Sequence, residues 1–304
     1  MNTTASDLLV LGVGAATWDE LWLVDQFRDS ECVIQASAHA AMGGGPVATA
    51  LCLLSQLGNR TAIIDSCGDD EVGLKIVSEL KRRNVATELM QRCPNATSAR
   101  AVILVRTEDG ARQIYFLPSN LEAPIMTNAM RQALASARLL HLNGRHESLA
   151  RQMVAEAQTL EVEISFDGGA GRYREGIRDL VQASHVRIVS HDFAVSYSGS
   201  DDLKMMFQEL LRPPARIVVI TVGKDGCYWA GPDHEIHHLS PPAVSVVDTT
   251  GCGDVFHGAF LHGWIRGWPP ERCASQANTF AALNAEGLGG RFVLNAHNLH
   301  SIST

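Results

Sequence analysis

Two glycines and an aspartate follow a run of β-branched residues in the C-terminal part of the chain. They lie in VVDTTGCGDVFHGAF, residues 246–260, whose second half has the apolar spacing of a helix. Gly251 and Gly253 would let the backbone approach an anion, and the free N–H groups of the new helix would point at it. Asp254 could then accept a proton from a nucleophile, or could simply cap the helix. The segment predicts a phosphate site.

Two further glycine-rich segments flank strands or helices. Residues 43–80 read GGGPVATALCLLSQLGNRTAIIDSCGDDEVGLKIVSEL, in which glycines open a helix that is followed by a strand, an acidic turn and a second helix. Residues 220–231 read ITVGKDGCYWAG, a strand, a glycine turn and a second strand. Taken alone, either set of glycines could serve only as turns.

Together, these segments resemble the signatures of the ribokinase-like, or phosphofructokinase B, sugar kinases. The D-T-T-G-x-G-D motif is similar to the second signature of that family, and residues 43–80 are similar to the first. The resemblance covers nearly the whole chain. It implies an ATP-dependent kinase that transfers the γ-phosphoryl group to a sugar hydroxyl. Such a reaction depends mainly on positioning and on charge neutralisation.

The resemblance also implies roles for the residues of the C-terminal motif. In that family the last aspartate takes the proton of the sugar hydroxyl, the preceding backbone amides form an anion hole, and the first aspartate and second threonine help to hold a monovalent cation. The matching residues are Asp254 as base, Gly251, Cys252 and Gly253 as anion hole, and Asp248 and Thr250 beside K⁺.

On the sugar side, the resemblance implies contacts from the first glycines and from an acidic residue after the first strand. Many relatives carry Asn three residues after the glycines, where this chain has Ala48. An arginine after strand RLLHL and a glycine turn should emerge at the carboxyl end of the sheet, where open α/β folds bind ligands. The implied substrate residues are Gly43, Gly44, Gly45, Asp19 and Arg145.

On the nucleotide side, the 220–231 turn and the helix of residues 271–286 correspond to the ATP-binding elements of the family. The implied contacts are Thr221, Gly223, Gly226 and Asn278. Mg²⁺ should accompany ATP because it bridges phosphate oxygens. Relatives often carry Asn-x-x-Glu where this chain has Ser-His-Asp-Phe at 190–193. Asp192 or Asp167 could act on the metal through water, or could only cap a helix or a strand end.

The favoured substrate class is a furanose ketohexose or a derivative of one, because HLNGR and GGGPVATA look most like ketohexokinases and sulfofructose kinases. Ribose, a deoxy-ketogluconate and nucleosides stay open. An anionic substrate ranks second, since Phe116 stands where a polar residue would be expected. A non-catalytic binding protein on the same fold is the main rival. A Rossmann dehydrogenase is disfavoured because LGVGAAT lacks the third glycine.

The elements that must position these residues alternate between short apolar strands and helices. This order predicts one ribokinase-like α/β domain over residues 1–304, a three-layer sandwich around a mostly parallel sheet. Residues 18–42 and 98–118 read as strands that leave the sheet to form a small β-sheet lid, with a hairpin at 108–110. In the family such lids often pair between subunits, which implies a homodimer.

Composition narrows the classes of protein. The net charge of −8 and the absence of a large Lys/Arg cluster argue against nucleic-acid binding. No window approaches a membrane span, and seven scattered cysteines favour a reducing compartment, so a cytoplasmic enzyme is expected. The twelve histidines form no HExxH or comparable ligand array, so a metal-hydrolase function is not predicted.

Overall fold

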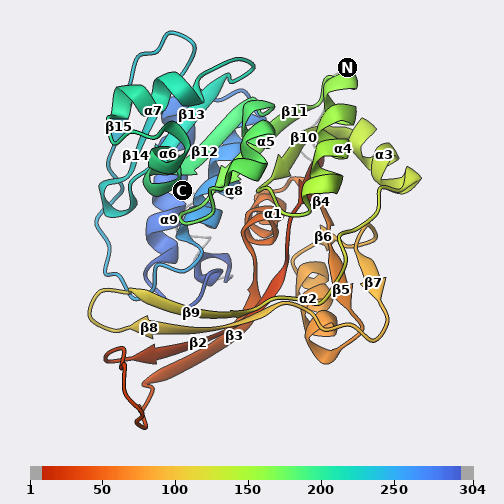
Figure 1. The fold of residues 1–304 in the computed structure, drawn as a ribbon. Coiled ribbons are helices and arrows are strands. Elements are labelled where there is room, and N and C mark those ends of the chain that lie inside the picture. Colours follow the sequence, from red (N-terminus) through yellow and green to blue (C-terminus); the bar gives the residue numbers. More distant parts are fainter. Residues whose placement is uncertain (1–8, 296–304) are drawn as a thin grey trace.

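The computed structural model describes residues 9–295 of the chain. The fold is built on a nine-stranded sheet (Figure 1). The strand order is β15-β14-β13-β12-β11-β10-β1-β4-β6, with parallel pairing throughout except at β14 and β15. These strands are β1 Leu9–Val13, β4 Arg60–Ile64, β6 Val85–Ala86, β10 Ala137–Leu142, β11 Glu163–Gly168, β12 Val186–Ser190, β13 Ile217–Thr221, β14 Cys227–Ala230 and β15 His237–Leu239. The predicted mostly parallel sheet is confirmed.

Helices cover both faces of this sheet because alternate strand residues point to opposite sides. Val10 packs in one core with helices of the first and last parts of the chain, whereas Leu9 and Leu11 pack in the other. The first face carries α1 Pro46–Gln56, α2 Glu71–Arg82, α8 Cys252–Trp264 and α9 Pro270–Asn284. The second carries α3 Asn128–Ala135, α4 Glu147–Thr159, α5 Arg178–Gln182, α6 His191–Ser198 and α7 Leu203–Leu210.

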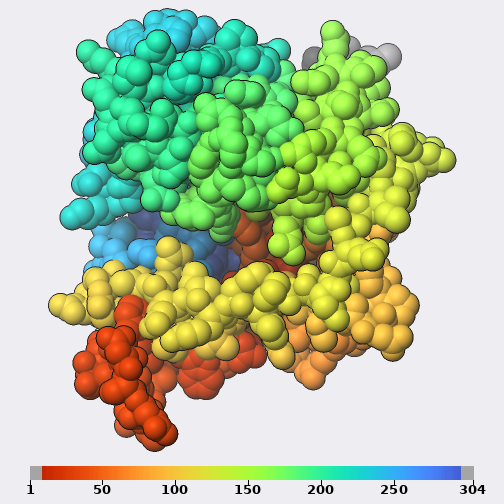
Figure 2. All heavy atoms as spheres, viewed as in Figure 1, coloured from red at the N-terminus to blue at the C-terminus, as the bar shows by residue number. Residues whose placement is uncertain are grey.

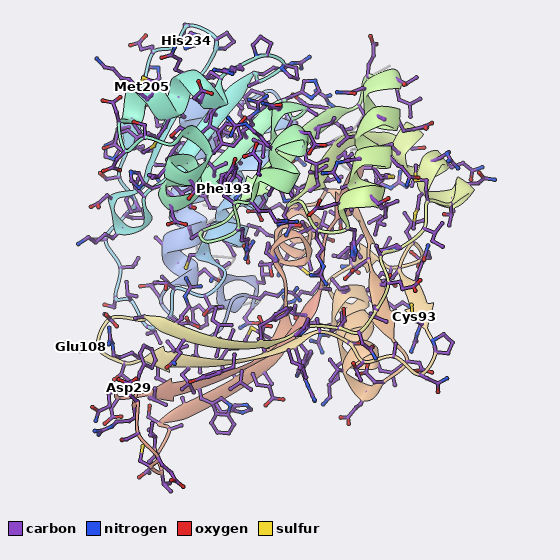
Figure 3. The ribbon with its side chains drawn as sticks, in the orientation of Figure 1. Asp29, Cys93, Glu108, Phe193, Met205 and His234 are labelled. Atoms are coloured by element: carbon purple, nitrogen blue, oxygen red, sulfur yellow. The ribbon has the colours of Figure 1, made fainter. Side chains whose placement is uncertain are left out.

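A second, four-stranded sheet forms the predicted lid and lies apart from the α/β body (Figure 1). Its order is β3-β2-β8-β9, with β2 Thr17–Val24, β3 Ala38–Gly44, β8 Arg100–Arg106 and β9 Arg112–Leu117. Glu108 lies at the tip of the β8–β9 hairpin (Figure 3). The four buried side chains Leu21, Ala101, Ile103 and Val105 give the sheet a small core of its own.

Several short elements differ from the sequence-based expectation. Helix α6, which follows the predicted strand β12, was not predicted; it begins at His191 because the Ser190 hydroxyl accepts a hydrogen bond from Phe193 N at 3.1 Å and caps it. The pair β5 Ser66–Gly68 and β7 Gln91–Cys93 was also not predicted. None of the helices in the described range 9–295 is long and apolar enough to span a membrane.

One buried ion pair joins the base of the lid to the body. Arg291, 1% exposed, donates to Glu79 Oε1 at 3.0 Å, to Gly44 O at 3.0 Å and to Thr49 Oγ1 at 3.1 Å. Glu79 in turn accepts a hydrogen bond from Gly43 N. The lid strand β3, helix α1, helix α2 and the loop before Asn295 therefore share a single polar centre.

We expect Arg291→Met to lower the free energy of unfolding by about 3–5 kcal/mol, because it leaves the Glu79 carboxylate buried without its partner. Arg83→Met provides the control, since Arg83 contacts the same carboxylate at 3.3 Å from a more exposed position. Its loss should stay below about 1 kcal/mol. Urea unfolding measures both, and equal losses would show that the burial of Arg291 adds nothing to the pair.

Candidate active site

Helix α8 begins at the predicted anion-binding turn. Gly251 is its N-terminal cap and has φ of 69°, a left-handed conformation that favours glycine. A Cβ at this position would lie 2.3 Å from Gly290 O, so a larger residue has no room. The backbone around Gly251, Cys252 and Gly253 therefore opens the helix as predicted, and Asp254 lies in its first turn.

The carboxylate of Asp248 stabilises this turn through hydrogen bonds. Its side chain is fully buried, and its Oδ1 accepts hydrogen bonds from Thr250 N at 2.8 Å and Thr250 Oγ1 at 2.6 Å. Its Oδ2 accepts from Gly289 N at 2.8 Å. All of these donors are neutral, so the carboxylate charge is buried with no opposite charge among them. A buried charge of this kind favours a bound cation.

Asp254 lies among four charged groups that come from distant parts of the sequence. Burial, together with the nearby carboxylates of Asp167 and Asp19, raises the pKa of Asp254 to about 7, while Arg172 and Arg112 oppose the shift. A carboxyl group with such a pKa gains and loses its proton near neutral pH, which suits a general base.

The two arginines were not found from the sequence. Arg172 lies in the loop after β11, and Arg112 begins the lid strand β9. The sequence offers one signal for each arginine. Arg172 follows the end of a strand, and Arg112 follows the turn of a hairpin. Arg145, which was predicted at the substrate side, is not among the charges that most strongly affect Asp254. Its backbone N–H donates to Asn143 Oδ1 at 3.2 Å.

Asp19 and the glycines of β3 are packed directly against one another. A Cβ on Gly44 would lie 1.9 Å from Asp19 Oδ2, so the carboxylate occupies the space that a side chain at 44 would need. Thr17 Oγ1 donates to Asp19 Oδ1 at 2.8 Å, and burial raises the pKa of Asp19. Gly45 follows as the N-terminal cap of α1. The structure therefore places Asp19 against Gly44, the middle one of the three predicted glycines, whereas Ala48 is fully buried in α1.

The predicted nucleotide residues lie at one end of the main sheet. Thr221 ends β13, and Gly223 and Gly226 bound a single helical turn that leads into β14. Asn278 differs from expectation because it is buried, and its amide donates to Leu239 O at 3.0 Å. Its amide therefore has a partner within the protein, and it ties α9 to β15.

The two aspartates considered for magnesium also have partners. Asp192 is exposed, and its Oδ2 accepts a hydrogen bond from Gly171 N at 2.7 Å. Asp167, at the end of β11, lies 3.8 Å from Arg172 Nη1 and 3.5 Å from His257 Nε2. Burial acts to raise the pKa of Asp167, but His257 and Arg172 outweigh burial and lower it.

The lid lies below the body in the view of Figure 2, and blue atoms from the last part of the chain are visible between the two. The residues that act on Asp254 thus come from both sides of this gap: Asp19 and Arg112 from the lid, Asp167 and Arg172 from the body. A small molecule held between lid and body would meet charges of both signs.

The fold and the site together define the class of ribokinase-like sugar kinases. Ribokinase of Arabidopsis thaliana, solved with ribose and ATP, superposes with a TM-score of 0.79 at 20% identity, covering 93% of this chain and 94% of that one. Residues 9–296 match the pfkB family carbohydrate kinase domain, and the chain belongs to that family. It is a phosphotransferase that acts on an alcohol group.

Two relatives show the range of substrates within the family. An ATP-dependent ribose-1-phosphate kinase of Halopiger xanaduensis is 26% identical over 284 residues, which cover 93% of each chain. Fructokinase-2 of Solanum lycopersicum is 27% identical over 241 residues, covering 73% of this chain and 72% of the relative.

Asp254→Asn should stabilise the fold at high pH. Because the folded-state pKa lies above the unfolded value, stability is lost as pH rises from about 4 to about 7, and the asparagine variant escapes this loss. We expect a gain of about 1–3 kcal/mol at pH 8 that shrinks toward zero near pH 4. Urea unfolding at both pH values measures it. A variant less stable than wild type at pH 8 would contradict the raised pKa.

Proposed function

We propose that this protein transfers the γ-phosphoryl group of ATP to a hydroxyl of a ketohexose or a ketohexose derivative, with Asp254 as the general base. The observation that carries the proposal is the position of Asp254 in the first turn of α8, with a pKa near 7 and two arginines acting on it. A base at this place can take the hydroxyl proton while phosphate oxygens face the backbone N–H groups beside it.

The amides of Gly251, Cys252 and Gly253 would stabilise the charge that develops on the transferring group. Their N–H groups open α8, and the positive end of a helix dipole favours an anion there. Arg172 and Arg112 add positive charge from two sides of the same carboxylate. Positioning and charge neutralisation of this kind make up most of the catalysis of phosphoryl transfer.

ATP would bind along Thr221, Gly223 and Gly226, at the end of the sheet where β13 turns into β14. Mg²⁺, when bound, bridges phosphate oxygens and neutralises their charge. Asp192, which accepts a hydrogen bond from Gly171 N, and Asp167, which faces the charge of Arg172 at 3.8 Å, would reach it through water. Asn278 would lie beside the nucleotide on α9, with its amide N–H hydrogen-bonded to Leu239 O.

Asp19 and the backbone of Gly43, Gly44 and Gly45 would hold the sugar. The Asp19 carboxylate has one oxygen bonded to Thr17, and a carboxylate can accept hydrogen bonds from two neighbouring hydroxyls. The named activities of the relatives include both a free and a phosphorylated sugar, so the family accommodates either. Arg145 stays a predicted substrate contact.

The outer face of the lid supports the proposed homodimer. Val102, Tyr115 and Leu117 are exposed apolar residues on the paired strands β8 and β9. An exposed strand with apolar side chains is typically covered by another chain. A second copy of this lid would supply such a cover.

Purified enzyme should release ADP from ATP in the presence of a ketohexose, and Asp254→Asn should lower kcat by about 10²–10⁴ with little change in ATP affinity. A coupled ADP assay across ketohexoses, ribose, deoxy-ketogluconate and nucleosides measures this and ranks the substrates. Asp233→Asn is the matched control, because Asp233 is exposed in the loop between β14 and β15. Near-normal turnover of Asp254→Asn would remove that residue from the mechanism.

Potassium should raise the activity at fixed Mg²⁺ and ionic strength, because the Asp248 carboxylate is buried and accepts only neutral donors. Replacing K⁺ with a large organic cation of the same concentration should remove the stimulation, since such an ion cannot enter the space beside Thr250. Initial rates in the two salts provide the measurement. Identical rates would exclude a monovalent-cation site at this turn.

A further inference from the structure

Two histidines and an aspartate meet in the interior of the protein, where helix α8 packs against the main sheet. His141 lies on β10, Asp167 at the end of β11 and His257 on α8, and their side chains are 0%, 2% and 5% exposed. One possible ligand atom from each lies within 4.8 Å of the other two. His257 follows Asp254 by three residues, so the cluster lies one helical turn from the proposed base.

Each member of this cluster has a buried polar atom without a hydrogen-bond partner within residues 9–295. These atoms are His141 Nε2, Asp167 Oδ2 and His257 Nδ1. A buried polar atom left unsatisfied typically costs about 1–3 kcal/mol. Asp167 and His257 face each other through their other atoms, Oδ1 and Nε2, at 3.5 Å. Unsatisfied buried polar atoms on all three members of the cluster favour a bound ligand there.

The chemistry of the three groups selects the ligand. Both imidazole rings are buried, and neutral imidazole is the form that binds a metal. Two imidazoles and a carboxylate suit divalent transition metals, whereas Mg²⁺ prefers oxygen ligands alone.

The surroundings orient the cluster toward a metal. His141 Nδ1 lies 2.8 Å from Ser165 Oγ, which leaves Nε2 facing the cluster, as expected when a neighbouring group fixes the ligand ring. Arg172 lies 3.8 Å from Asp167 Oδ2 and opposes a cation, but its side chain is 41% exposed and can turn toward solvent. A cation bound to Asp167 would then neutralise the carboxylate in place of Arg172.

We propose that His141, Asp167 and His257 form a binding site for one divalent transition-metal ion such as Zn²⁺. Three protein ligands leave the fourth position of a tetrahedral ion for water. With metal–ligand bonds of about 2.0–2.1 Å the ligand atoms stand about 3.3 Å apart, so each side chain has to move by less than about 1 Å. The site does not depend on which sugar the enzyme phosphorylates.

Titration of the full-length, chelator-stripped protein with Co²⁺ tests the proposal. Calorimetry should show one equivalent bound, the visible absorption should be that of nitrogen and oxygen ligation, and Zn²⁺ but not excess Mg²⁺ should displace the cobalt. The same ion should raise the thermal unfolding midpoint. No stoichiometric binding, or the intense absorption of thiolate ligation, would overturn the site and leave a hydrogen-bonded or water-bridged cluster.

Three variants locate the ion. His257→Gln should abolish the binding, and Ser165→Ala should weaken it by about 10- to 100-fold while keeping all three ligands. His234→Asn is the control, because His234 is exposed in the loop after β14, at the far end of the body (Figure 3). Unchanged binding by Ser165→Ala and His257→Gln would place the metal elsewhere, and the milder serine variant keeps the test valid if His257→Gln does not fold.

Discussion

The buried contact between Arg291 and Glu79 is the constraint on which the arrangement of the site depends. The guanidinium bonds to Glu79, Gly44 and Thr49, while Glu79 bonds to Gly43. The loop that carries Arg291 also packs Gly290 against the turn at Gly251. The glycines proposed to hold the sugar and the turn proposed to bind the anion, more than 200 residues apart in the sequence, are therefore positioned by one loop. Satisfied charges in a dry interior hold such a geometry more strictly than apolar packing alone, because every displaced bond leaves a buried polar group without a partner.

The same principle explains the electrostatics of the proposed base. Burial and two carboxylates favour the neutral form of Asp254, and two arginines favour the charged form, so the pKa lies near neutrality and not at either extreme. Neither set of charges alone would serve catalysis. Carboxylates without arginines would keep Asp254 protonated and would repel phosphate, whereas arginines without carboxylates would leave a weak base. A pKa near working pH combines a useful ionised fraction with basicity.

Much of this could be predicted from the sequence, for reasons that are physical. The helix start at Gly251 with Asp254 in its first turn, the glycines before α1 and the alternation of strands with helices are local patterns, and the structure has all three. Arg112, Arg172 and the meeting of His141 with His257 could not be read in that way. Each depends on which strand ends lie side by side, and the sheet order that decides this is not local. The hydrogen bond from the Asn278 amide to Leu239 O could not be predicted either, because it depends on how α9 packs against β15.

The lid contributes charges of both signs to the site. The strands that carry these charges are hydrogen-bonded to the same central strand, so the two charges keep a fixed position relative to each other. Asp19 lies on β2 and Arg112 on β9, and both strands pair with β8, at Ala101 and Val105 respectively. Continuous pairing across these three strands fixes Asp19 and Arg112 relative to one another. Any displacement of the lid then removes or restores a carboxylate and a guanidinium together, so the net charge near Asp254 changes little while the distances change. A displacement of the lid would thus alter the distances around Asp254 more than the balance of charge near it.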